Sequence, residues 1–351
     1  MAKSLKIPFH EVELSTEEHT EFFEQLVFLR DDPIADISGF GYYAVSRKAH
    51  EMGVPVLLQG QGGDELFWGY EWVRKAAAQT LRKQARIHFG RWNGYEYLNS
   101  IKPTGLYPRD LWQWAKLGFG IPEALRSFYR DGSSNPDDIV FMDALSSFSE
   151  QKNDIYQYYT PDFFECVRAI GPESLYRFSK PWPNIPVTIT SLITKTYLFE
   201  NGIAQGDRLS MANSLELRLP LVDFRLVETV IGLRRNYPDQ TLPAKHWFKE
   251  AVRDLIPEDI LTRPKRGFHT PAEWHDQLGE RYRRMIKDGI LVQSGIISSS
   301  AGDFFSNASI PITEFSNSNM RFKILVLEIW ARQMIKNSNI FSEYSFSRTR
   351  D

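Results

Sequence analysis

The chain has 351 residues, of which 42% are hydrophobic and 25% charged, as in ordinary globular domains. Its formal net charge of -2 argues against nucleic-acid or anionic-membrane partners, since both need a clear basic excess, and its single cysteine excludes an internal disulfide. The N-terminal residues MAKSLKIPFHEV lack the apolar core of a signal peptide, and no apolar run is long enough to span a membrane, so we expect a cytoplasmic protein.

The N-terminal residues predict a strand followed by a helix. Residues 7–14 (IPFHEVEL) are rich in β-forming side chains and predict a short strand. Residues 16–30 predict a helix with one buried face, because apolar side chains recur at helical spacing. Ser15 can cap this helix, and Glu18, three residues later, can complete a capping box.

The next residues predict a loop, a second helix and a second strand. Residues 31–41 contain a proline and glycines that predict a loop, and residues 42–52 predict a helix that stops at Gly53. Residues 54–60 (VPVLLQG) are apolar on both faces, which is typical of a central parallel strand covered on both sides. Together these elements predict a doubly wound α/β unit.

Beyond Tyr70 the hydrophobic pattern becomes mainly helical. The clearest helical spacing occurs in residues 202–217, 221–233, 245–256 and 321–335. We therefore expect a protein of the α/β class that forms a single domain over residues 1–351. An incomplete doubly wound parallel sheet would occupy residues 1–72, and a large, mostly helical part would occupy residues 73–351.

The stretch GQGGDE, residues 60–65, is the strongest candidate for a site. It follows a predicted parallel strand, and open parallel sheets bind ligands beyond the carboxyl ends of their strands. Its glycines permit close backbone approach to a ligand, and Asp64 could bind a hard cation such as Mg²⁺ that bridges phosphates. The alternative is a structural turn in which Asp64 or Glu65 caps the helix that follows.

Several blocks of sequence resemble the synthetase domain of the asparagine synthetase family, whose ATP-pyrophosphatase fold is of the adenine nucleotide alpha hydrolase type. The stretch QGQGGDELFWGY is similar to the family's nucleotide turn, and DDPIADISGFGYYAVSRKAHEMGVPVLL to the residues that lead into it. Further along, TYLFENGIAQGDRLSMANSLELRLPLVD, then KHWFKEAVRDLIPEDILTRPKRGFHTP, then KILVLEIWARQMI resemble later family blocks in the family's order.

The resemblance implies a reaction, its cofactors and a set of nucleotide-binding residues. ATP and Mg²⁺ would activate a carboxylate, aspartate or a related one, as an acyl adenylate with release of pyrophosphate, and ammonia would then form the amide. Asp64 would bind Mg²⁺, and Lys265 would contact pyrophosphate as a catalytic cation. Gln59, Gly60 and Gly62 would lie against the nucleotide.

The same resemblance points to Glu216 and Arg218 as substrate-binding residues, which we expect near the end of a helix. Arg218 is suited to pair with a substrate carboxylate through two parallel hydrogen bonds. The alternative is an internal ion-pair network of these two side chains with Asp207 and Arg208, and the sequence does not decide between them.

The chain also departs from the family pattern. It has no Ser-Gly-Gly-x-Asp-Ser pyrophosphate loop and no N-terminal glutaminase, so we expect an N-terminally truncated synthetase domain that is inactive alone. Gln61 stands at a catalytic position where the family usually has an acid, and an amide cannot act as a general base. Trp68 replaces a glycine and is expected to narrow the site.

These departures leave three functions open. The chain could be the C-terminal part of an asparagine synthetase-type ligase, an inactive relative that binds or scaffolds, or an amidotransferase for a secondary metabolite or polysaccharide. A sheet without its first strand would expose an apolar edge, so we expect a partner chain or oligomer to supply the missing loop and glutaminase.

Overall fold

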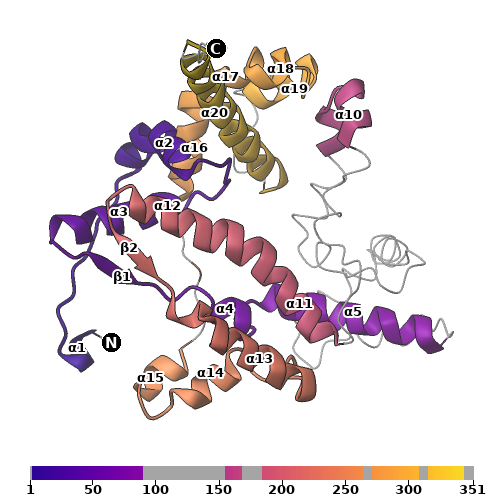
Figure 1. Cartoon of the computed structure of the whole chain (residues 1–351). Coiled ribbons are helices and arrows are strands. Elements are labelled where there is room, and N and C mark those ends of the chain that lie inside the picture. Colours follow the sequence, from indigo (N-terminus) through magenta and orange to yellow (C-terminus); the bar gives the residue numbers. More distant parts are fainter. Residues whose placement is uncertain are drawn as a thin grey trace, which may run out of the picture.

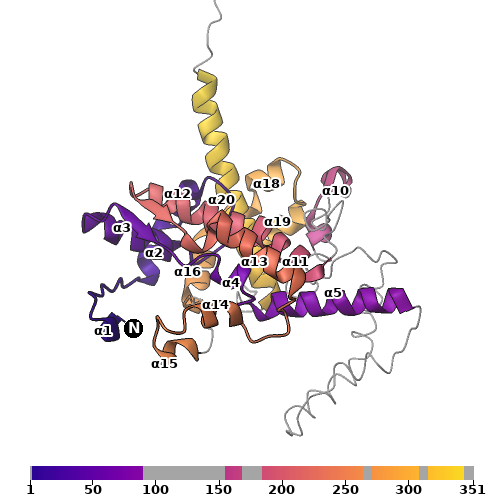
Figure 2. The ribbon, with the colours of Figure 1, turned by 60° about the horizontal axis from the view of Figure 1, so that its bottom comes forward.

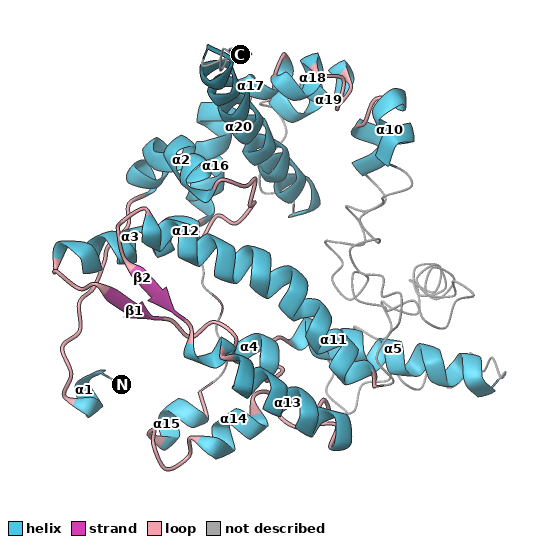
Figure 3. Ribbon diagram, in the orientation of Figure 1, coloured by secondary structure: helices cyan, strands magenta, loops and turns pink. Residues whose placement is uncertain are grey.

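The computed structural model describes residues 2–89, 155–167, 184–263, 267, 270–307 and 315–343. These residues are mostly helical and include a small parallel sheet (Figures 1 and 3). The predicted α/β class is therefore confirmed. The described elements of the first half are α1 (Ala2–Leu5), α2 (Thr16–Arg30), α3 (Gly39–Glu51), β1 (Val56–Leu58), α4 (Gly63–Leu66), α5 (Glu71–Phe89), a 3₁₀ helix (Ile155–Tyr158) and α10 (Pro161–Val167).

The remaining elements begin with three consecutive helical segments over residues 185–211, which we call the rod. They are α11 (Ile185–Ile193), a π-helix (Thr194–Ala204), α12 (Gln205–Met211), β2 (Glu216–Arg218), a 3₁₀ helix (Pro220–Val222), α13 (Phe224–Asn236), α14 (His246–Ala251), α15 (Glu258–Leu261), α16 (Ala272–Tyr282), α17 (Arg284–Lys287), α18 (Ile290–Gln293), α19 (Ser299–Ser306) and α20 (Phe315–Glu343). None of the described helices combines the length and the apolar character needed to cross a lipid bilayer.

The sheet consists of two parallel strands in the described part of the chain. β1 pairs with β2 in a register that sets Leu57 opposite Leu217, and α12 packs against both β2 and α3 (Figure 1). Since β2 comes from residues 216–218, the α/β unit draws on a segment that we expected to be helical. The prediction of β1 as a central strand is not met in the described residues, where its one partner is β2 and Leu58 is 71% exposed.

The predicted strand over residues 7–14 is wrong. These residues have no regular structure and are mostly exposed, with Phe9 at 74%. β-forming side chains alone do not make a strand, because a strand needs a neighbouring backbone that supplies hydrogen bonds and a surface that buries one face.

The helices that follow agree better with the sequence. The capping box of α2 is confirmed: the Glu18 amide donates to Ser15 Oγ at 3.0 Å, and Glu18 Oε2 accepts from the Ser15 amide at 3.3 Å. α3 begins at Gly39, earlier than predicted, inside the expected loop. A Cβ at Gly39 would lie 1.7 Å from Nη2 of the buried Arg30, so here glycine allows the helix to pack closely.

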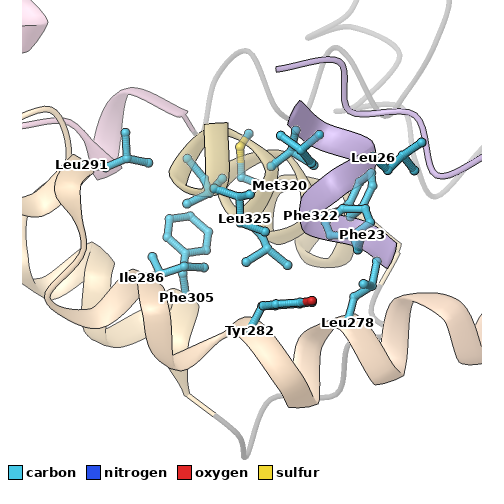
Figure 4. Close-up of a cluster of buried hydrophobic side chains, with 14 of the residues drawn as sticks. Phe23, Leu26, Leu278, Tyr282, Ile286, Leu291, Phe305, Met320, Phe322 and Leu325 are labelled. Carbon is cyan, nitrogen blue, oxygen red and sulfur yellow. The ribbon is translucent and has the colours of Figure 1, made fainter. Parts of the chain in front are cut away.

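A large apolar cluster, which we call the helical core, holds α2 against the C-terminal helices (Figure 4). α2 contributes Phe23, and α16 and α20 contribute Leu278 and Leu325, all of them buried. Burying an aliphatic or aromatic side chain of this size stabilises a fold by about 1.5–3 kcal/mol. Phe40 of α3 belongs to the same cluster, so the helical core also holds α3 in place.

A second apolar cluster fixes the rod relative to the residues after β1. Trp68 and Ala76 pack against Ile189 and Ile193 of α11. α5 runs on beyond this contact and projects from the rest of the molecule in both views (Figures 1 and 2). The rod of α11, the π-helix and α12 thus spans the distance between this cluster and the sheet.

Candidate functional site

A polar cavity of about 530 Å³ lies where β1 ends, in the size range of small-molecule sites. Its described lining comes from four parts of the chain: the loop before α3 with the start of α3, the loop after β1 with α4, the π-helix, and Gly267 and Thr270 before α16. Gln59 begins the second of these loops, and its amide donates to the Arg218 carbonyl at 3.0 Å. The end of β2 therefore fixes the start of the loop that forms one cavity wall.

The glycine turn after β1 has one position that requires glycine. Gly62 has φ +94°, and a Cβ there would lie 2.8 Å from the Leu221 carbonyl oxygen. Its amide donates to Glu65 Oε2 at 3.0 Å, which makes Gly62 the N-cap of α4. Gly62 is outside the cavity lining, whereas Gly60 lines it and would meet nothing within 4 Å of an added Cβ.

Asp64 lines the cavity and is held by a cation from another element. Lys245 Nζ lies 2.9 Å from Asp64 Oδ1, and the backbone amide of Lys245 donates to the Phe67 carbonyl at 2.8 Å. Gly69 closes the other side, because a Cβ there would lie 1.9 Å from Asp64 Oδ1. The direction of this carboxylate is thus set by its surroundings.

Gln61 also faces the cavity, and two neighbours fix its carboxamide. Its Nε2 donates to the Tyr42 hydroxyl at 3.0 Å, and a Cβ added to Gly202 would meet its Oε1 at 2.9 Å. Gly202 belongs to the π-helix, a conformation that often occurs at functional sites. Together with Tyr197 and Asn201, it forms the wall opposite the loop after β1.

Glu65 places a buried carboxylate in the cavity wall. The residue is 2% exposed, and its Oε1 accepts a hydrogen bond of 2.9 Å from the Tyr70 hydroxyl. Burial and then the charge of Glu65 raise the pKa of Tyr70, so this hydroxyl keeps its proton. The alternative of a structural turn is thus met in part, since Glu65 both caps α4 and lines the cavity.

Asp36 supplies a further carboxylate, from the loop before α3. Its Oδ1 accepts from the Ser38 amide at 2.9 Å and from Ser38 Oγ at 2.6 Å, and its Oδ2 accepts from Gln205 Nε2 at 3.0 Å. Burial and then Asp36 raise the pKa of both Tyr42 and Tyr197, so these two hydroxyls lie within the field of this carboxylate.

The other predicted site residues lie elsewhere. Glu216 and Arg218 are on β2 rather than at a helix end, and they form an exposed ion pair of 3.6 Å outside the cavity lining. Arg208 pairs instead with Asp32 at 2.6 Å. Lys265 lies outside the described residues.

Trp68 does not narrow the cavity. It is 2% exposed within the second apolar cluster, and its Nε1 donates to Asp239 at 2.9 Å. Its φ of +58° is left-handed, which explains why glycine would suit this position. The helix expected after the glycine turn is divided into α4 and α5, with Trp68 between them.

The sequence interpretation missed four parts of this site: Asp36, Tyr42, the π-helix residues and Lys245. All four lie in blocks that resemble the family, although no role was assigned to them: Asp36 and Tyr42 in DDPIADISGFGYYAV, the π-helix residues in TYLFENGIAQGDR, and Lys245 at the start of KHWFKEAV. The hydrophobic spacing of residues 194–204 does not distinguish a π-helix from an α-helix.

A metal ion at this site would need ligands from a bound substrate. The described residues hold no group of three or more His, Cys, Asp or Glu side chains that could ligate one. Mg²⁺ commonly uses one or two carboxylates together with phosphates and water, so the oxygen donors of Asp64 fit such a shared site.

The fold and the cavity define an α/β protein with an acidic, partly aromatic site at the end of a parallel strand. A family model described as asparagine synthase matches residues 1–332, and the chain therefore belongs to that family. This confirms the resemblance read from the sequence blocks. A comparison with solved structures gives no significant match.

Three relatives illustrate the range of similar proteins. A Mycobacterium bovis protein named "Putative asparagine synthetase" is 25% identical over 270 residues, which cover 76% of this chain and 37% of the relative. Asparagine synthetase 1 of Bacillus subtilis is 25% identical over 281 residues, with 78% and 40% covered. Amidase chry2 of Gibberella zeae is 23% identical, again with 78% and 40% covered. The chain thus spans about two fifths of the length of these relatives.

Proposed function

We propose that the cavity is part of the active site of an AMP-forming amide ligase. ATP would activate a carboxylate as an acyl adenylate with release of pyrophosphate, and ammonia would then displace AMP to form an amide. The observation that carries this proposal is the loop after β1, which sets Gln59, Gly60, Gln61 and Asp64 into one cavity wall. Open parallel sheets bind nucleotides at such a position, and membership of the asparagine synthase family supports the chemistry.

The charged residues have separate roles in this proposal. Asp64 would donate one oxygen ligand to Mg²⁺, and the metal would neutralise charge that develops on the departing pyrophosphate. Lys245, 2.9 Å away, holds the Asp64 side chain in position. Lys265 would add a cation to the pyrophosphate, a role that rests on the family resemblance.

The acceptor in this proposal is aspartate or a related carboxylate. Arg218 would pair with that carboxylate if its exposed ion pair with Glu216 opened. An acceptor other than aspartate is a specific second candidate, because two relatives that match 78% of this chain are named amidases, chry2 of Gibberella zeae and chyE of Penicillium rubens.

We also propose that a further polypeptide segment completes the site, from a longer chain or a partner. An apolar cavity of about 360 Å³ beside β1, lined in part by Val45, Leu57 and Leu217, supports this, as does the exposed side chain of Leu58. An open strand edge of this kind is a template for pairing with another strand.

Calorimetry with Mg-ATP tests the proposal. The wild-type protein should bind, and Asp64→Ala and Lys265→Ala should each weaken binding about tenfold or more, since a charged contact is worth about 1.5–3 kcal/mol. Asp303→Ala is the control, because Asp303 forms an exposed pair with Lys287 far from the cavity lining. Equal binding by all variants would reject the assigned roles. Absence of binding to the folded wild-type protein, both alone and with the completing segment supplied, would reject the site.

A further inference from the structure

Acidic side chains outnumber basic ones in the described lining of the cavity. Its described lining contains Asp36, Asp64 and Glu65, and none of the described lining residues is basic. Lys245 offsets Asp64 directly. Arg30 lies behind Asp36, with its guanidinium donating to the backbone oxygens of Ile34 and Asp36.

Among the described residues, no cation lies at ion-pair distance from the carboxylate of Glu65 or of Asp36. The hydrogen-bond partners of Glu65 in the described structure are neutral donors, the Gly62 amide and the Tyr70 hydroxyl, and Glu65 is 2% exposed. A buried carboxylate is costly unless a positive charge accompanies it. The wall around Glu65 is therefore suited to a ligand that brings one.

Aromatic side chains line the cavity near both acids. Tyr42 and Tyr197 each line the cavity, and the charges of both Asp36 and Glu65 act on their hydroxyls. The Tyr197 ring is 5.7 Å from that of Tyr70 in an edge-on arrangement. Tyrosine faces attract cations, and their oxygens accept hydrogen bonds from an ammonium group.

We propose that the end of the cavity between Asp36 and Glu65 is an ammonium-binding subsite, with Tyr42 and Tyr197 as its walls. The subsite rests on the proposed amide ligase function, in which ammonia is the nucleophile. It answers the problem posed by Gln61, because the amide at that position cannot balance an ammonium charge. Asp36 and Glu65 supply that negative charge from neighbouring positions, and their binding of ammonium would raise its local concentration. One of the two carboxylates would then take up a proton from ammonium, which leaves ammonia with a free electron pair for the attack.

The chemistry of the walls favours ammonium over a metal ion. A hard metal ion needs a shell of six or more oxygen ligands, and the described residues contain no cluster of three or more acidic, His or Cys ligands. An ammonium ion needs only a few acceptors and gains from aromatic faces. Asp36 is oriented for this role by Ser38 and Gln205, which leave its position fixed before a ligand arrives.

The first test compares thermal unfolding in ammonium chloride with unfolding in sodium chloride at equal concentration. Ammonium should raise the midpoint of the wild-type protein more than sodium does, because a ligand that binds the folded state stabilises it. Asp36→Asn should abolish this difference. Asp32→Asn removes the same charge from the same loop at a residue outside the cavity lining, and it should retain the difference.

A second measurement does not depend on a variant that folds. Saturation-transfer NMR with methylammonium on the wild-type protein should give a signal that ammonium suppresses and sodium does not. Equal midpoints in the two salts, a difference retained by Asp36→Asn, or absence of saturation transfer would each overturn the subsite. Mg-ATP calorimetry on the same protein separates the two proposals: ATP binding without ammonium binding rejects only the subsite, and the reverse rejects only the ligase.

Discussion

The helical core buries mainly hydrocarbon, whereas the residues after β1 bury charge. In the helical core, Phe23 packs 5.9 Å from Phe322 and 6.1 Å from Tyr282, and the contacts are apolar. Around the loop after β1, Arg234 pairs with Asp239 through two hydrogen bonds of 2.7 and 2.9 Å, and Glu65 is almost fully buried. Apolar packing stabilises without direction, but buried ion pairs fix geometry at a high desolvation cost.

This difference indicates a division of labour within one fold. The helical core stabilises the protein, and the polar network sets the direction of the cavity side chains. Arg234 illustrates the second role, since it also donates to the Leu66 carbonyl at 2.6 Å and lies 4.6 Å from the centre of the Trp68 ring. Variants in the two regions should therefore change different properties.

The largest loss of stability is expected from Phe23→Ala in the helical core. Truncation of a fully buried phenylalanine removes apolar burial and leaves a cavity, which costs about 3–5 kcal/mol in the free energy of unfolding. Urea unfolding measures this loss. Mg-ATP affinity of the folded fraction should stay at the wild-type value, and a parallel loss of affinity would contradict the division of labour.

Arg234→Met should cost a similar or slightly smaller amount, about 3–4 kcal/mol, because it leaves Asp239 buried without its cation. Here the affinity for Mg-ATP should fall as well, since the carbonyl of Leu66 loses its donor. Arg253→Met is the control, because its pair with Glu250 is exposed and its loss should leave the unfolding midpoint unchanged. A stable Arg234→Met protein with normal affinity would show that the network has no positioning role.

The buried polar side chains around the helical core include His19, and it makes stability depend on pH. Its ring stacks 4.1 Å from Trp274, and neither ring nitrogen has a hydrogen-bond partner among the described residues. Burial, then Arg30 and His275, lower the pKa of His19 to about 4 from 6.5. Because the unfolded chain takes up the proton first, stability should be full above pH 6.5 and fall by about 3 kcal/mol toward pH 4.

Urea unfolding at pH 7 and pH 4.5 measures this dependence, and His19→Leu should reduce it. The remaining slope includes His275, whose pKa burial also lowers, and the carboxylates. An equal slope in the wild type and in His19→Leu would contradict the assignment to His19.

The smallest effect on stability is expected from a matched pair of glycine variants. Gly202→Ala in the π-helix would push a Cβ to 2.9 Å from Gln61 Oε1, whereas Gly232→Ala in α13 meets nothing within 4 Å. Gly232→Ala should stabilise by up to about 1 kcal/mol with unchanged ligand affinity. Gly202→Ala should change stability by less than about 1 kcal/mol but weaken Mg-ATP and ammonium binding, which calorimetry and the two-salt comparison measure.

The sequence predicted what depends on local pattern. Ser15 and Glu18 defined the start of α2, and the glycine turn after β1 identified one wall of the cavity, because capping and turn chemistry act over a few residues. The longer blocks that resemble known sequences also identified the asparagine synthase family correctly.

The sequence did not predict what depends on distant contacts. β2 was taken as helical because its three residues become a strand only beside β1, far away in the chain. Asp36 has no local motif, and its orientation depends on Gln205 in α12. Glu216 and Arg218 stand two residues apart on a strand, so they share one face of it and pair with each other, which a helix end would not have predicted.

Amide hydrogen exchange, measured with and without Mg-ATP, tests the central claim most directly, that the residues after β1 form the ligand site. Exchange should slow at residues 59–61 and along the π-helix, and it should stay the same in the helical core around α2 and α16. Unchanged exchange at residues 59–61, or protection confined to the helical core, would contradict the account.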